Sequence, residues 1–241
     1  MTTDQPPAAS AAGDEPESGQ KSRGGGPAEW DARYARGELV WGAPPNSTVV
    51  EYVYGLDKRV AQLAEGTPPP LPRALDLACG EGRHALWLAT HGWQVQAVDF
   101  SQVGIDKGRT VAARLSRSVR ARVDWHCADI TELDAAEVTG PFELILMVFV
   151  HLSADQRRPL LHQLAGMLSP GGMLLVLGHD SSNVTNGYGG PQDADILFTP
   201  EDIRADLDGQ GLTIRVADHV FRPTEGPDAI DALVIAERPT S

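Results

Sequence analysis

Cysteine is scarce in this chain of 241 residues, which contains only Cys79 and Cys127. Two cysteines are too few for a disulfide framework, and neither has a metal-type spacing, so we expect no bound metal. Long apolar runs are also missing, because no stretch approaches the roughly 20 apolar residues that a membrane-spanning helix needs. The first residues do not combine a basic segment with an apolar run, so we expect a cytoplasmic protein without a secretory signal.

Basic residues are outnumbered: 20 lysines and arginines face 33 aspartates and glutamates, and the formal net charge is −13. Binding a phosphate backbone needs a strongly positive face, so this balance argues against nucleic acid as the main partner. It also argues against binding to an anionic membrane surface. A small neutral or cationic ligand remains compatible, and both a monomer and a homodimer remain open.

The composition fits one α/β domain, because 41% of the residues are hydrophobic and can bury a core. Residues 1–27 contain mainly Pro, Ala, Gly, Ser and acidic residues, which predicts a disordered tail. We expect a single domain over residues 28–241. It would consist of a helical cap over 28–66 and a Rossmann-like core over 72–238, joined by a proline-rich connector.

Short apolar runs alternate with helical patterns after residue 72. The predicted strands are 74–78, 94–99, 122–127, 142–148, 173–177, 212–220 and 230–236. The predicted helices are 82–91, 101–118, 154–168 and 200–208, preceded by a helix that begins at Asn46 or Ser47 and ends near Ala64. This alternation is typical of a parallel sheet that is covered by helices on both faces.

The turn from the first strand into the first helix has the features of a nucleoside site. Gly80 and Gly82 let the backbone turn tightly and approach a ligand closely. Asp99 ends the second strand, where a carboxylate accepts hydrogen bonds from both ribose hydroxyls. Asp129 follows the third strand and can accept from an adenine amino group, with Ile130 against the ring. An aspartate at that position is also an ordinary helix cap.

Two nucleoside cofactors fit this outline. A dinucleotide site prefers the motif G-x-G-x-x-G. If the motif begins at Gly80, its third glycine position falls on Ala85, and the motif permits alanine there. Asp76 discriminates better, because a carboxylate there repels a pyrophosphate and favours the ammonium group of a methionine moiety. S-adenosylmethionine is therefore preferred over NAD. An NAD-binding oxidoreductase and a non-catalytic nucleoside-binding protein of the same fold remain the alternatives.

The run from Leu75 to His84, with Asp99, Asp129 and the run from Leu168 to Gly172, resembles the class I S-adenosylmethionine-dependent methyltransferases over residues 28–238. More narrowly, the chain resembles the bacterial tellurite-resistance or thiopurine-type branch. This is carried by Trp30-Asp31, Arg33-Tyr34, Leu39-Val40-Trp41-Gly42, Pro45-Asn46 and Ala78-Cys79-Gly80-Glu81-Gly82-Arg83-His84. Ala78 stands where the loop of this fold usually has its first glycine.

The resemblance implies a Rossmann-like, seven-stranded, mostly parallel sheet of order 3-2-1-4-5-7-6 with strand seven antiparallel. The motifs and the resemblance together assign cofactor binding to Trp41, Asp76, Ala78, Gly80, Gly82, His84, Asp99, Phe100, Ser101, Asp129, Ile130 and Met147. The expected activity is methyl transfer to a small-molecule acceptor.

The acceptor side is less defined by the sequence. His151 follows the fourth strand and is either a general base or a partly buried histidine bonded to a backbone carbonyl. His179 follows the fifth strand, and Tyr188 lies in the loop 181–193, whose position is typical of a lid. These three are the candidate catalytic residues. The identity of the acceptor and the need for a base stay open, because thiols need little help and phenols need more.

Overall fold

The computed structural model describes residues 25–37, 39–40, 42, 44–54, 56 and 70–240. Residues 1–24 of the predicted tail and the predicted cofactor residue Trp41 lie outside the described residues.

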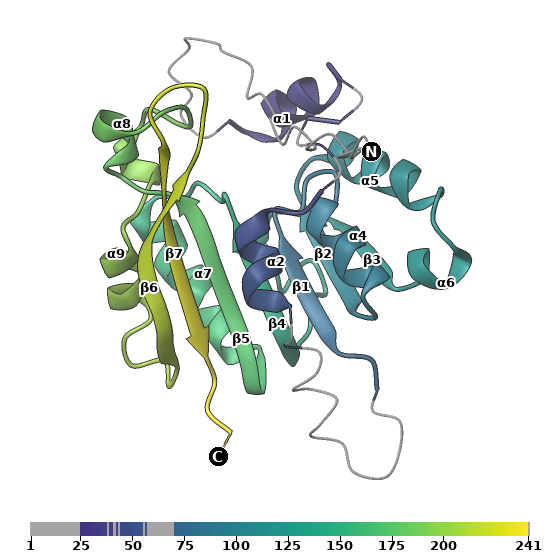
Figure 1. The fold of residues 1–241 in the computed structure, drawn as a ribbon. Helices are drawn as coiled ribbons and strands as arrows, with labels where there is room; N and C mark the ends of the chain where they lie inside the picture. The colour runs from purple at the N-terminus through teal and green to yellow at the C-terminus, as the bar shows by residue number, and fades with distance from the viewer. Residues whose placement is uncertain are drawn as a thin grey trace, which may run out of the picture.

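Seven strands form one sheet in the described part of the chain, in the order β3-β2-β1-β4-β5-β7-β6 (Figure 1). The strands are β1 (Arg73–Leu77), β2 (Gln94–Asp99), β3 (Val123–Cys127), β4 (Phe142–Val148), β5 (Leu168–His179), β6 (Thr213–Arg222) and β7 (Ala229–Glu237). All neighbours pair in parallel except β7, which runs antiparallel to both β5 and β6. The strand order and the antiparallel seventh strand that the resemblance implied are both confirmed.

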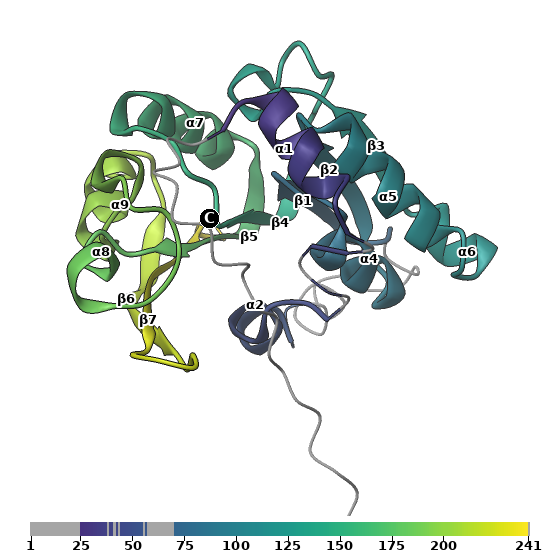
Figure 2. The same ribbon diagram turned by 90° about the horizontal axis from the view of Figure 1, so that it is seen from above.

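Helices cover both faces of the sheet (Figure 2). The helices in the described residues are α1 (Pro27–Tyr34), α2 (Ser47–Val53), α4 (Arg83–Thr90), α5 (Gln102–Ala112), α6 (Arg117–Arg120), α7 (Ala154–Gly166), α8 (Asn183–Asn186) and α9 (Pro200–Asp206), with the short 3₁₀ turns η1 (Ile130–Glu132) and η2 (Ala194–Ile196). The predicted fold class, an α/β sheet with helices on both faces, is confirmed.

The sheet separates two apolar cores, and β4 contributes to both. Leu144 and Leu146 belong to the core on the side of α2, α4 and α5, whereas Ile145 and Met147 belong to the core beneath α7 and α9. Successive residues of a strand point to opposite faces, so a strand buried on both sides is apolar throughout. This explains why β4 is apolar from Leu144 to Val148 and was recognisable as a buried strand.

Three predicted elements differ from the structure by more than two residues at one end. The predicted helix 101–118 is broken, since α5 ends at Ala112 and the Ser116 side chain accepts a hydrogen bond from Val119 N to start α6. The Asn46 cap is confirmed, but α2 ends at Val53 because Tyr54 adopts an extended backbone. Residues 57–69 lie outside the described residues.

The fifth strand is longer than predicted, because it already begins at Leu168. Gly171 and Gly172, which precede the predicted strand 173–177, lie within β5, where the pairing with β4 shifts in register. Gly171 has a positive φ of 77°. Among the described residues, no helix combines the length and the apolar character needed to cross a membrane.

Candidate active site

The loop between β1 and α4 turns through three residues with left-handed backbone. Their φ angles are 51° at Ala78, 54° at Gly80 and 76° at Gly82. A side chain on Gly80 would meet the hydroxyl of Tyr34 at 2.5 Å, and one on Gly82 would meet the ring of Trp125 at 2.3 Å. The loop therefore requires both glycines, because Tyr34 from α1 and Trp125 from β3 pack directly against it.

Asp99, at the end of β2, holds this loop in place. Its Oδ2 accepts a hydrogen bond from Gly80 N at 2.8 Å, and its Oδ1 accepts one from Ser101 N at 2.8 Å. Burial raises the pKa of Asp99 above its ordinary value, although the two backbone hydrogen bonds oppose this shift. Each carboxylate oxygen has a second lone pair, so Asp99 can also accept from the hydroxyls of a ribose.

Asp76 lies one strand away, on β1, and is fully buried. Its Oδ2 accepts a hydrogen bond from Ala85 N at 2.9 Å, in the first turn of α4. Burial raises the pKa of Asp76 to about 7, against the smaller lowering effects of the Ala85 hydrogen bond and of Arg83. A cationic group bound nearby would offset this cost, since an opposite charge favours the ionised carboxylate.

His84 forms a link to the N-terminal segment. Its Nε2 accepts a hydrogen bond from Asn46 N at 3.2 Å. Burial lowers the pKa of His84 to about 3, and the positive charge of Arg83 adds to this effect, so the ring is neutral. The predicted cofactor contact of His84 stays a prediction, and the structure places this histidine where it ties the cap of α2 to α4.

Helix α1 lies across the carboxyl edge of the sheet, above the glycine loop (Figure 1). Asp31 of α1 accepts hydrogen bonds from Ser101 Oγ at 2.5 Å and from Val103 N at 3.2 Å. Lys107 Nζ donates to the backbone carbonyls of Tyr34 and Gly37. Sequence reasoning did not assign Asp31 a role, although an acidic residue facing the positive end of α5 is a recognisable signal.

Four other predicted cofactor residues lie around the ends of β2, β3 and β4. Phe100 is half-buried between β2 and α5. Asp129 is exposed and caps η1 by accepting from Thr131 N at 2.8 Å, which is the ordinary role left open for it. Ile130 is buried beside it, and Met147 is 1% exposed within the core. Their contacts with a cofactor stay predictions.

The structure brings two of the three candidate catalytic residues together. The rings of His151 and His179 stack with centroids 5.6 Å apart and planes inclined by 6°. Burial lowers the pKa of His151 to about 3, with smaller contributions from His179 and Arg33. Tyr188 lies elsewhere: it is 42% exposed, and its ring packs against Gly226 in the hairpin between β6 and β7.

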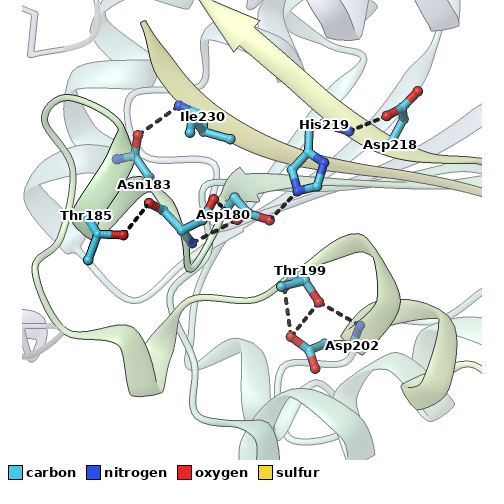
Figure 3. A network of polar contacts seen from close by, with 9 residues as sticks. Asp180, Asn183, Thr185, Thr199, Asp202, Asp218, His219 and Ile230 are labelled. Atoms are coloured by element: carbon cyan, nitrogen blue, oxygen red, sulfur yellow. Dashed lines mark hydrogen bonds and ion pairs between the residues drawn. The ribbon is translucent and has the colours of Figure 1, made fainter. Parts of the chain in front are cut away.

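The loop that follows β5 is anchored to the sheet by two buried side chains (Figure 3). Asp180 accepts from Ser182 N at 2.8 Å and lies 3.1 Å from His219 Nε2. Asn183 Oδ1 accepts from Ile230 N, and its Nδ2 donates to Gly189 O at 2.9 Å. A loop fixed in this way, with the short helix α8 inside it, can cover the acceptor side.

Within the described residues, no group of three or more His, Cys, Asp or Glu side chains could hold a metal ion.

A family model described as "Methyltransferase domain" matches residues 74–172, which run from β1 to β5. The solved structure of the N-methyltransferase NodS from Bradyrhizobium japonicum WM9, in complex with S-adenosyl-L-homocysteine, superposes with a TM-score of 0.62 and 18% identity, over 88% of this chain and 98% of that one. The glycopeptide N-methyltransferase MtfA, complexed with S-adenosylmethionine, gives a TM-score of 0.53 and 21% identity, over 77% and 94%. The chain has the class I methyltransferase fold.

Curated relatives share only part of their length with this chain. Hemagglutinin 1 of Eikenella corrodens is 30% identical over 107 residues, or 44% of this chain and 33% of that protein. The ribosomal RNA small subunit methyltransferase C of Alcanivorax borkumensis is 28% identical over 116 residues, or 44% and 31%. The ubiquinone biosynthesis O-methyltransferase of Caulobacter sp. (strain K31) is 32% identical over 104 residues, or 43% and 39%. The matched segment thus spans about a third of each relative.

The site in this methyltransferase fold has groups of the kind that S-adenosylmethionine needs. Asp99 provides carboxylate oxygens for ribose hydroxyls, and its hydrogen bond from Gly80 N keeps the left-handed turn of the glycine loop beside them. The buried carboxyl of Asp76 offers a partner for an ammonium group. The donor set therefore fits the cofactor that the sequence predicted.

Proposed function

We propose that this chain is an S-adenosylmethionine-dependent methyltransferase that acts on a small molecule. The observation that carries the proposal is Asp99 at the carboxyl end of β2, hydrogen bonded to the glycine loop at Gly80. This geometry lies within the segment that the methyltransferase-domain model matches. Ligands of open α/β sheets bind at this edge, outside the carboxyl ends of the strands.

In this proposal the chain contributes mainly binding and alignment. The cofactor supplies an activated methyl group on a sulfonium. Asp99 accepts hydrogen bonds from the ribose hydroxyls, and the buried carboxylate of Asp76 balances the positive charge of the methionine ammonium. Helix α1, through Tyr34, covers the glycine loop and excludes water. Alignment and dehydration at this site lower the barrier for in-line displacement.

The acidic charge of the chain supports a small-molecule acceptor. A formal net charge of −13 is unfavourable for binding a phosphate backbone. The relatives are named for different acceptors, one for ribosomal RNA and one for ubiquinone biosynthesis. The net negative charge of this chain favours the small molecule over RNA. The tellurite-resistance or thiopurine-type branch is part of the same proposal and rests on the motifs around Trp30 and Arg33.

A turnover assay tests the proposed function. Purified protein is incubated with S-adenosylmethionine carrying a labelled methyl group and with panels of thiols, phenols, amines and ribosomal RNA. We expect S-adenosylhomocysteine to form in proportion to a labelled small molecule. Labelling of RNA alone would contradict the small-molecule acceptor, and cofactor binding without any transfer would favour the non-catalytic alternative.

A further inference from the structure

A buried histidine and aspartate face each other where β5 pairs with β7. His179 ends β5 and lies opposite Asp231 in the antiparallel register. The two residues are 3% and 1% exposed, and His179 Nδ1 lies 3.2 Å from Asp231 Oδ1. The geometry of this contact does not form a hydrogen bond, so Asp231 acts on the imidazole through its charge. A carboxylate beside Nδ1 stabilises the imidazolium that forms when Nε2 accepts a proton.

Asp231 has a second partner on its other oxygen. Arg222, at the end of β6, places Nε 3.1 Å from Asp231 Oδ2. The guanidinium of Arg222 also lies 5.7 Å from the ring of Phe149. Arg222 therefore holds Asp231 in place from the side opposite to His179.

Aromatic rings surround His179. The Phe149 ring is 4.9 Å from it, and the His151 ring stacks on it at 5.6 Å. Phe149 has a φ of 55°, which is a strained conformation for a bulky residue. Such strain concentrates at functional sites, where it aims a side chain that ordinary backbone would not. Here the strained turn directly after β4 places a flat apolar ring beside the histidine.

The loop after β5 passes over the same imidazole. A side chain on Gly190 would lie 2.9 Å from His179 Nε2, so only glycine lets the backbone come this close. The loop is anchored by Asn183, as described above. It shields the ring from bulk water, which strengthens electrostatic interactions at the site.

His151 is less suited to accept a proton. Its pKa is lowered to about 3, first by burial, so protonation near neutral pH is unfavourable. Its Nε2 is buried and has no hydrogen-bond partner among the described residues. His151 is therefore better placed to give or accept a neutral hydrogen bond than to serve as the base.

We propose that His179, with the carboxylate of Asp231 beside it, is the general base for methyl transfer to an aromatic hydroxyl, so that the acceptor is a phenol-like molecule. This inference rests on the proposed function. The phenolic O–H gives its proton to His179 Nε2, and the oxygen forms a bond to the methyl carbon. The carbon–sulfur bond breaks, and its electron pair stays on sulfur as the thioether of S-adenosylhomocysteine. The imidazolium then releases its proton to water.

The acceptor class follows from the need for a base. An aromatic amine is uncharged at neutral pH and attacks through its free lone pair, and a thiol with a pKa near 8.5 is partly ionised already. A phenol with a pKa near 10 is almost wholly protonated at neutral pH and gains most from a positioned base. The rings of Phe149 and His151 pack against His179 and make its surroundings aromatic, which suits an aromatic acceptor.

The test compares one phenol that is protonated at the assay pH with one electron-poor phenol of similar shape that is already ionised. Asp231→Asn keeps the shape of the side chain but removes its charge, and His179→Gln removes the base. A matched control is His91→Gln, because His91 is exposed at the end of α4, where its Nδ1 lies 2.8 Å from Trp87 O. Unfolding midpoints and S-adenosylmethionine binding are measured for every variant.

We expect Asp231→Asn and His179→Gln to slow methylation of the protonated phenol by about 10²–10⁴-fold, the usual contribution of a general base. The ionised phenol should be methylated within a few-fold of the unsubstituted rate, and raising the pH until the first phenol ionises should restore its rate. His91→Gln should leave the methylation of both phenols unaffected.

Equal losses on both phenols, or methylation of thiols or amines but of no phenol, would overturn the assignment of base and acceptor. Absence of S-adenosylmethionine binding in the unsubstituted protein would instead contradict the proposed function, so the two failures are distinguishable.

Discussion

Ala78 lies in a left-handed conformation, with φ 51°, at the position where the methyltransferase loop usually has a glycine. A residue with a Cβ in this region is strained by roughly 1–2 kcal/mol. Residues in unusual conformations persist when the surrounding structure determines them, and they concentrate at ligand sites. The loop therefore keeps a left-handed backbone at residue 78, although alanine stands there in place of glycine.

Replacing Ala78 with glycine tests this strain. Ala78→Gly should stabilise the protein by ~0.5–1 kcal/mol, because relief of the left-handed strain exceeds the entropy that glycine adds to the unfolded chain. Urea unfolding measures the change. Ala89→Gly in α4 is the control and should destabilise by about 1 kcal/mol or more. A destabilised Ala78→Gly variant would show that the loop is not strained at this residue.

Asp76 predicts a pH dependence of stability in the absence of cofactor. Burial raises its pKa to about 7 from an ordinary 3.8. At pH values between 3.8 and about 7, folded Asp76 keeps a proton that the unfolded chain has lost. The stabilisation from this retained proton is fully present below pH 3.8 and is lost as the pH rises to about 7. Asp76→Asn, which cannot ionise, should gain stability relative to the unsubstituted protein as the pH rises.

The measurement is urea unfolding of both proteins at about pH 4.5 and about pH 7.5. The advantage of Asp76→Asn should be small at the lower pH and reach a few kcal/mol at the higher pH. A difference that stays constant between the two pH values would mean that Asp76 titrates alike in the folded and unfolded chains.

At the scale of elements, the glycine loop and β3 are coupled through Trp125. A Cβ on Gly82 would meet the Trp125 ring at 2.3 Å, whereas Gly92, also at positive φ, has nothing within 4 Å. Gly82→Ala should therefore cost more stability than Gly92→Ala by the energy of this clash, about 1–3 kcal/mol for overpacking. Chemical denaturation of the two variants checks this, and equal losses would mean that backbone strain alone accounts for the cost.

The sequence predicts elements best where apolar runs are bounded by polar or glycine residues. The boundaries of β2 and β4 match the prediction, because the apolar positions of each strand are preceded by proline or polar residues. The break between α5 and α6 was missed, since the Ser116 cap competes locally with continuation of the helix. The early start of β5 was missed because Gly171 suggests a turn, although a strand can pass through it with a shift in register.

At the scale of the whole molecule, the convergence of Gly80, Gly82 and Asp99 was predictable from the sequence, and the pairing of His179 with Asp231 was not. Gly80, Gly82 and Asp99 come together through one strand–turn–helix unit and its neighbouring strand. The pairing of His179 with Asp231 depends on the antiparallel register of β5 with β7. That register is set by the complete sheet, so no local pattern in the sequence could have assigned a role to Asp231.

Cofactor binding should stabilise the entire domain. A ligand that binds only the folded state adds about 2.7 kcal/mol at a hundredfold excess over its dissociation constant. S-adenosylmethionine should therefore raise the thermal unfolding midpoint of the unsubstituted protein in a concentration-dependent way. The Asp99→Ala variant should show no such rise at the same concentrations, and a similar rise in both would place the ligand away from Asp99.

Calorimetric titration with S-adenosylmethionine, S-adenosylhomocysteine and NAD, repeated on Asp99→Ala, is the most direct test of the proposed cofactor. We predict that the first two ligands bind in the micromolar range, that NAD does not bind, and that Asp99→Ala loses binding of both. Binding of NAD alone would contradict the methyltransferase proposal and favour an oxidoreductase.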